Sequence, residues 1–218
     1  ENPESGLATR LFHDVENDSY TLAFRGTEDI GDFISGNRQA VDPSAPQYEQ
    51  ARILVEDVQR ALGDRLTDLT GHSLGGGLAA AASMMSGIRA TTFNAAGLNS
   101  RTVMAAGGTW SEERAEGLIT NYRVNDEIVT SLQERGSIGS VPLALSAFAI
   151  GPTGLVLQGL AAALPDAAGQ QITIDAIDAA GESMHLLQRN NLLQMMPLQL
   201  HGMDYVLRGV LAYSKGDL

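Results

Sequence analysis

The sequence predicts an α/β fold in which helices flank a mostly parallel sheet, within a single domain that covers residues 1–218. Strand-like segments alternate with helical segments along the chain, as in βαβ units. A G-x-S-x-G motif centred on Ser73 stands between a strand-like and a helix-like segment. Hydrophobic residues make up 44% and charged residues 18% of the chain, which is typical of a globular domain with one sizeable core.

The predicted strands are short segments rich in β-branched, aromatic and aliphatic residues. They comprise residues 19–24, 65–70, 89–94, 118–124 and 171–175. Helical segments separate most of them, so we expect parallel pairing. Functional groups in such sheets gather where the strands end, which directs attention to the polar residues that follow each strand.

The predicted helices differ in character. Residues 51–62 place their apolar side chains on one stripe and end at Gly63, which indicates an amphipathic helix. Residues 74–85 are rich in alanine and follow the G-x-S-x-G motif directly. Further expectations are a surface loop over residues 29–44, a short helix before residue 118, and helices over residues 176–191 and 203–214.

Charge and cysteine content exclude several classes of function. The net charge of −12 opposes attraction to nucleic acid, so no nucleic-acid partner is expected. The absence of cysteine excludes disulfides, thiolate metal sites and a cysteine nucleophile. The chain begins at Glu1 without a signal-peptide pattern, which predicts a processed or excised part of a longer protein.

Ser73 is the predicted nucleophile. A serine lifted from the end of a strand by a very sharp turn needs small neighbours, and Gly71 and Gly75 supply them. The helix that follows points its N-terminal N–H groups, including that of Leu74, toward any negative charge beside the hydroxyl. The alternative is a glycine-rich turn that only packs closely.

A serine nucleophile needs a histidine base, which in turn needs a carboxylate to orient it. Asp126 follows the strand over residues 118–124 and is the predicted acid, the alternative being an ordinary turn residue. His201 precedes the last predicted helix on a loop and is the predicted base. His185 lies in a predicted helix and is the alternative base.

A second oxyanion donor is expected from the turn after residues 19–24. The backbone N–H of Thr27 is the candidate, and it would act together with that of Leu74. No histidine pair has metal-ligand spacing, and residues 75–77 lack the Lys-Ser/Thr ending of a phosphate loop. We therefore expect neither a metal nor a cofactor.

These motifs together resemble the class 3 (fungal-type) lipase family of α/β-hydrolases. The resemblance lies in Phe-Arg-Gly-Thr at residues 24–27 followed by Gly-His-Ser-Leu-Gly-Gly at residues 71–76. It implies an α/β-hydrolase fold and a lipase-type active site. The implied site residues are Ser73, Asp126 and His201 as the triad, with Thr27 and Leu74 forming the oxyanion hole.

The predicted function is a serine carboxylester hydrolase that acts on lipids through an acyl-enzyme, as a phospholipase A or an acylglycerol lipase. The alternatives are a thioesterase or peptidase on the same fold, and a non-catalytic membrane-binding toxin module with a vestigial elbow.

The C-terminal pattern is similar to lipase domains of bacterial secreted effectors and toxins, including phospholipases. That likeness implies a lipid or phospholipid substrate, transient contact with a membrane surface, secretion or delivery within a larger bacterial protein, and a cognate inhibitor protein if the protein is a toxin.

An apolar segment without formal charge covers residues 136–165, between the predicted acid and the predicted base His201. Residues 151–154 divide it into two runs that are each too short to cross a bilayer, which needs about 20 residues. One interpretation is an insertion of short helices packed on the core. The other is a lid over Ser73 that opens at a lipid surface.

Overall fold

The computed structural model describes residues 5–26, 46–124, 165–177 and 202–216 of the protein. Within these ranges the strands form a six-stranded sheet in the order β1-β2-β3-β4-β5-β6. The strands are β1 (Thr9–Asp14), β2 (Ser19–Phe24), β3 (Leu66–His72), β4 (Arg89–Phe93), β5 (Ile119–Val124) and β6 (Gln170–Ile174). β1 pairs antiparallel with β2, and every later pairing is parallel. The predicted mostly parallel sheet is therefore confirmed.

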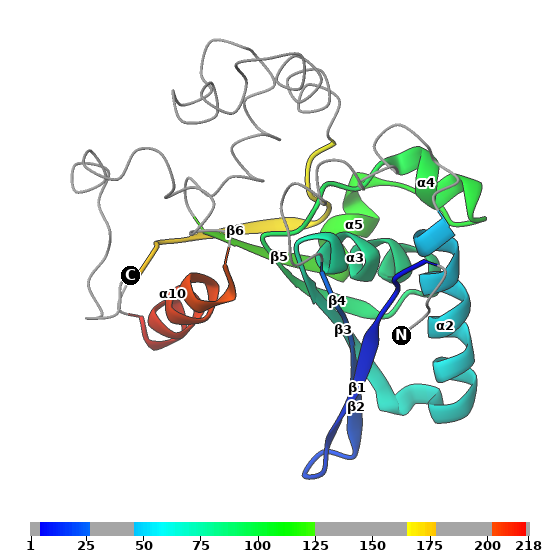
Figure 1. The fold of residues 1–218 in the computed structure, drawn as a ribbon, viewed down its shortest axis with the longest axis horizontal. Coiled ribbons are helices and arrows are strands. Elements are labelled where there is room, and N and C mark those ends of the chain that lie inside the picture. The colour runs from blue at the N-terminus through cyan, green and yellow to red at the C-terminus, as the bar shows by residue number, and fades with distance from the viewer. Residues whose placement is uncertain (1–4, 27–45, 125–164, 178–201, 217–218) are drawn as a thin grey trace.

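Helices cover both faces of the sheet. They are α2 (Pro46–Leu62), a 3₁₀ turn η2 (Gly63–Arg65), α3 (Leu74–Ser86), α4 (Ser100–Ala105), α5 (Glu112–Leu118) and α10 (Met203–Lys215). Figure 1 shows α2, α3 and α5 on one side of the sheet and α10 on the other side, next to β5 and β6. This layered arrangement confirms the predicted α/β class.

The central helix, α3, is enclosed by protein. All its residues from Leu74 to Met84 are buried, and most are glycine or alanine, so the helix lies close against β3 and β4. Its C-terminus is closed by Gly87 in the left-handed conformation, whose N–H donates to the carbonyl of Ser83 at 2.8 Å. Small side chains thus let the helix after Ser73 sit within the core.

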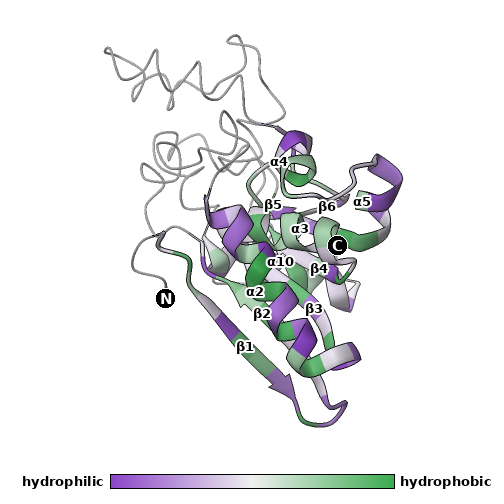
Figure 2. Ribbon diagram, turned by 90° about the vertical axis from the view of Figure 1, so that its right-hand side faces the viewer, coloured by the Kyte–Doolittle hydropathy of each residue, from purple (hydrophilic) through white to green (hydrophobic). Residues whose placement is uncertain are grey.

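The outer helix, α2, is amphipathic. Tyr48, Ala51 and Val55 face inward and are buried, whereas Arg52 forms an exposed ion pair with Glu49 at 2.6 Å. Figure 2 shows the corresponding mixture of hydrophilic and hydrophobic residues along α2, beside the more uniformly apolar α3. The helix therefore forms the outer layer of this side of the sheet.

β5 contributes to two separate apolar clusters because its side chains alternate between the faces of the sheet. Ile119 joins the larger cluster, built mainly from α2, α3 and the strands. Val124 joins the smaller cluster with Ile174 and Val206, beneath α10. The carboxyl end of β5 is thereby anchored from the α10 side.

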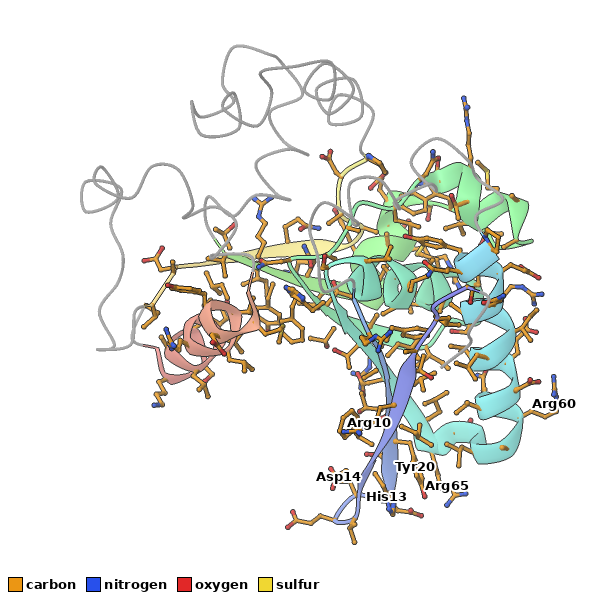
Figure 3. The ribbon with its side chains drawn as sticks, in the orientation of Figure 1. Arg10, His13, Asp14, Tyr20, Arg60 and Arg65 are labelled. Atoms are coloured by element: carbon orange, nitrogen blue, oxygen red, sulfur yellow. The ribbon has the colours of Figure 1, made fainter. Side chains whose placement is uncertain are left out.

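A hairpin of β1 and β2 extends from the edge of the sheet (Figure 1). The ring of Tyr20 stacks on that of His13 with centroids 4.3 Å apart, and the guanidinium of Arg65 lies 5.5 Å from its centroid. Figure 3 shows these side chains gathered near the tip of the hairpin, where β2 begins. The polar residues that follow β2 and β3 lie at the opposite end of these strands.

The observed elements correct some predicted boundaries. β3 continues two residues past the predicted strand, to His72, and α2 begins at Pro46 instead of residue 51. β1 was not predicted. Two helices, α4 and α5, lie where one short helix was expected. The predicted helix over residues 176–191 is wrong at Ala176 and Ile177, which are not helical, and its remainder lies outside the described residues.

Other predictions fall on parts of the chain that the structure does not describe. These are the predicted loop over residues 29–44 and the apolar insertion over residues 136–165, of which only Pro165 is described. Among the helices of the described ranges, none is both long and apolar enough to traverse a bilayer.

Candidate active site

Ser73 occupies a sharp turn between β3 and α3. It follows His72, the last residue of β3, and precedes Leu74, the first residue of α3. Its backbone has φ 57° and ψ −125°, a conformation that non-glycine residues rarely adopt. Such strain persists only where the surroundings hold it, and it is characteristic of a serine nucleophile presented above a parallel sheet. The predicted strand–elbow–helix arrangement, and with it the predicted α/β-hydrolase fold, is confirmed.

Backbone hydrogen bonds hold the strained serine in place. The N–H of Ser73 donates to the carbonyl of Phe93 at 3.1 Å, which ties the elbow to the end of β4. The carbonyl of Ser73 accepts from the N–H of Gly77 at 3.1 Å and from that of Ala96 at 2.9 Å. The residue is 2% exposed. Both backbone polar groups of Ser73 are therefore satisfied, which fixes the turn from two sides.

Glycines are required on both sides of Ser73. A Cβ atom at Gly71 would lie 2.2 Å from the carbonyl oxygen of Gly75, and one at Gly75 would lie 2.3 Å from that of Phe24. Each obstacle is backbone, which cannot rotate away as a side chain can. The prediction that Gly71 and Gly75 remove clashing atoms is therefore supported, and the obstacle at Gly75 is the end of the neighbouring strand β2.

Gly26 brings the segment after β2 against the elbow. A Cβ atom at Gly26 would lie 2.5 Å from the carbonyl oxygen of His72 and 3.4 Å from Cβ of Ser73. The N–H of Arg25 donates to the carbonyl of Ala8 at 2.9 Å and so fixes the segment at its other side. Gly26, which directly precedes Thr27 in sequence, therefore lies beside Ser73.

Leu74, the predicted oxyanion donor, lies at the N-terminus of α3. It is the first residue of α3, where backbone N–H groups have no acceptor within the helix. The positive end of the helix dipole adds to the attraction for negative charge at this point. Leu74 follows Ser73 directly, so its N–H belongs to the first turn of the helix that begins at the serine.

A turn after β4 connects the elbow with β5. Asn94 has φ 42° and is 1% exposed. Its N–H donates to the carbonyl of Tyr122 at 2.8 Å, and its Oδ1 accepts from the N–H of Val124 at 2.8 Å. The sequence predicted Asn94 only as the last residue of a strand. Asparagine at a strand end, a residue type that tolerates left-handed backbone, was the signal that could have indicated this turn.

Polar side chains continue this connection across the sheet. Oδ1 of Asn121 accepts from the hydroxyl of Thr92 at 2.9 Å and from the N–H of Ala95 at 3.3 Å. Its Nδ2 donates to Oε1 of Gln171 on β6 at 2.8 Å. Gln171 in turn donates to the carbonyl of Gly169 at 2.9 Å. Hydrogen-bond networks of this kind, here buried at Thr92 and Asn121, rigidify the strands that carry them.

The predicted active site lies only partly within the described residues. Ser73 and Leu74 occupy the predicted positions at the elbow. The other predicted site residues, which are Thr27, Asp126, His185 and His201, lie outside the described residues. In the described ranges no group of three or more His, Asp or Glu side chains could hold a metal ion.

Comparison with known proteins identifies the family. Residues 1–180 match the model of a phospholipase-like family described as the Tle-like phospholipase domain. An extracellular phospholipase A1 of Serratia liquefaciens is 40% identical over 122 residues, which are 55% of this chain and 38% of that protein. The chain therefore spans well under half the length of this relative.

Two solved structures are similar to this chain at low sequence identity. A triacylglycerol lipase from Penicillium expansum is 13% identical, with a TM-score of 0.44 over 90% of this chain and 75% of that chain. The esterase domain of a Rhodothermus marinus protein is 10% identical, with a TM-score of 0.33 over 89% of this chain and 98% of that chain.

The family match covers the elbow, the strands β1–β6 and the described part of the predicted active site. It confirms the predicted assignment to the lipases and phospholipases, and it agrees with the predicted class of enzyme, a lipid ester hydrolase. The chain belongs to the Tle-like phospholipase domain family.

Proposed function

We propose that the protein hydrolyses acyl ester bonds of phospholipids, with Ser73 as the nucleophile. The observation that carries this proposal is the strained, buried Ser73 between β3 and the N-terminus of α3. A non-glycine backbone with φ 57° is energetically unfavourable. Packing alone does not require this conformation, whereas presentation of a nucleophile at a sharp turn does.

The proposed reaction proceeds through an acyl-enzyme. Oγ of Ser73 attacks the ester carbonyl carbon while His201 takes the hydroxyl proton, and Asp126 orients and stabilises the resulting imidazolium. The tetrahedral intermediate collapses, the carbon–oxygen bond to the leaving alcohol breaks, and His201 returns the proton to that alcohol. Water then attacks the acyl-enzyme by the same route and releases the fatty acid. His185 is the alternative base.

The negative charge on the carbonyl oxygen would be held by the N–H groups of Leu74 and Thr27. Support for Leu74 comes from its position at the start of α3. Support for Thr27 comes from Gly26, whose backbone approaches His72 and Ser73 closely. Loss of one such donor typically costs about 10²–10³ in kcat.

The proposed substrate class follows from the family and from one relative. The family is described as phospholipase-like, and the Serratia relative is an extracellular phospholipase A1. An acyl ester of a phospholipid in a membrane or micelle is therefore the proposed substrate, with a triacylglycerol as the second. By the same relative, we propose that the protein acts outside the cell that makes it, in transient contact with a lipid surface.

A hydrolysis panel tests this proposal. The purified protein is incubated with phosphatidylcholine, triacylglycerol, an acyl thioester and a peptide, and the products are separated by mass spectrometry. We expect fatty acid and lysophospholipid from the first substrate, and about a 10⁶-fold lower kcat for Ser73→Ala. Preferred cleavage of the thioester or peptide would indicate an alternative enzyme class. Equal rates for wild type and Ser73→Ala would overturn the proposed nucleophile.

A further inference from the structure

We propose that Asn94 is a positioning residue for the reaction. Its side chain holds the carboxyl end of β5, from which the chain continues toward Asp126, in a fixed relation to the turn that carries Ser73. This inference rests on the proposed function, because it takes Asp126 as the triad acid.

The side chain of Asn94 replaces a backbone acceptor. In a regular parallel ladder, a residue donates its N–H to one residue of the neighbouring strand and accepts with its own carbonyl from the residue two positions later. Asn94 makes the first bond, to Tyr122, at 2.8 Å. At φ 42° its backbone turns away from the ladder, and Oδ1 accepts the N–H of Val124 at 2.8 Å instead. The ladder thus continues through a side chain for one more residue.

The same turn holds the nucleophile. Phe93, immediately before Asn94, accepts the N–H of Ser73 at 3.1 Å, and Ala96, two residues after it, donates to the carbonyl of Ser73 at 2.9 Å. Asn94 therefore stands between the two residues that hold Ser73 and makes two bonds to β5 itself. It joins the nucleophile to Val124, which precedes Asp126 by two residues.

Two properties of asparagine are needed at this position. Among residues with a side chain, Asn and Asp adopt left-handed backbone most readily, and their short side chains carry an acceptor oxygen that can reach a nearby N–H. Asn94 is 1% and Val124 0% exposed, so no water can replace a lost acceptor without rearrangement. Glycine would keep the backbone and lose the acceptor, whereas aspartate would keep both.

The central test compares Asn94→Gly with Asn94→Asp. We expect Asn94→Gly to lower kcat by about 100-fold, because a displacement of about 1 Å in a catalytic group has an effect of that size. KM should change little, because the side chain of Asn94 bonds to the backbone of β5 and has no proposed contact with substrate. The acid limb of kcat/KM against pH should move to lower pH, because a misplaced carboxylate stabilises the imidazolium of the base less. Asn94→Asp should recover most of the kcat.

Thr92→Val is the matched control. Thr92 lies on the same strand, is 0% exposed and donates one buried hydrogen bond to Asn121, at 2.9 Å. Its loss should lower the midpoint of thermal unfolding while leaving the pH profile of the folded enzyme unchanged. If Asn94→Gly is partly unfolded at the assay temperature, kcat is measured at a lower temperature and corrected for the folded fraction from circular dichroism.

A double-mutant cycle with Asp126→Asn decides whether Asn94 acts through the acid. We expect Asn94→Gly to have little further effect on kcat in the Asp126→Asn background, because residues that act as a unit are not additive. Additive losses, or an Asn94→Gly enzyme with wild-type kcat and pH profile, would overturn the positioning role. Full activity of Asp126→Asn alone would instead overturn the acid assignment of the proposed function.

Discussion

Replacement of Gly75 by alanine should disturb both stability and catalysis, because the added methyl group has no room. Its Cβ would lie 2.3 Å from the carbonyl oxygen of Phe24 and 2.8 Å from the carbonyl carbon of Arg25. An ordinary carbon–oxygen contact measures about 3.4 Å. The start of α3 and the backbone that follows β2 must therefore separate by about 1 Å.

The magnitude follows from two opposing terms. Overpacking of this kind costs about 1–3 kcal/mol, and the obstacle at Gly75 is backbone, which favours the upper end. Alanine gains about 1 kcal/mol over glycine within a helix. The net loss of about 2 kcal/mol should lower the unfolding midpoint by about 4–8 °C for a chain of this size. A displacement of about 1 Å beside Ser73 should lower kcat by about 100-fold.

Gly117→Ala provides the matched control. Gly117 lies in α5, and a Cβ atom there would meet nothing within 4 Å. We expect this variant to keep wild-type activity and to unfold at the same temperature or a few degrees higher. The assays are thermal unfolding followed by circular dichroism and hydrolysis of a soluble short-chain ester. A Gly75→Ala enzyme as stable and active as Gly117→Ala would refute the close approach of β2 to the elbow.

Two further predictions concern the base and the layer beneath α2. His201→Ala should be as damaging as Ser73→Ala, with no further loss in the double mutant, while His185→Ala keeps much of the activity; the opposite ranking in esterase assays would make His185 the base. Tyr48→Phe should leave stability unchanged or raise it by up to about 1 kcal/mol, because the buried hydroxyl has no hydrogen-bond partner in the part of the chain that the structure describes; a clear loss in chemical denaturation would mean that the hydroxyl is satisfied.

The elbow could be predicted from sequence because its chemistry is local. Glycines at fixed distances from Ser73, an apolar strand before it and an alanine-rich helix after it together leave few other conformations. The strand itself was predicted too short, because Gly71 and His72 have little strand preference of their own. Gly71 belongs to the strand through pairing with Phe24 of β2 and Thr92 of β4, and His72 through pairing with Phe93 of β4. Local pattern therefore found the nucleophile but not the full length of its strand.

β1 could not be recognised from pattern. It is an edge strand whose residues are almost all exposed, so apolar and polar side chains do not alternate along it. Its place depends on pairing with β2, which brings His13 onto Tyr20. Tertiary contacts, which a single sequence does not show, determine whether such a segment forms a strand.

The role of Asn94 was also beyond local pattern. In sequence it is the polar end of a β-branched and aromatic segment, and such a residue is usually a simple strand terminus. Its left-handed backbone and its bond to Val124 depend on where β5 lies in the folded sheet. The long-range pairing of β4 with β5 therefore determines the structural role of Asn94.

The most direct test of the central claim is covalent labelling of the proposed nucleophile. A fluorophosphonate reacts with an activated serine by forming an oxygen–phosphorus bond and releasing fluoride, and a vestigial elbow should not react. We expect stoichiometric labelling that peptide mass spectrometry maps to Ser73, with loss of phospholipid hydrolysis in proportion to the label. An unlabelled protein that still hydrolyses phospholipid, or a label on another residue with activity lost in proportion, would contradict the account.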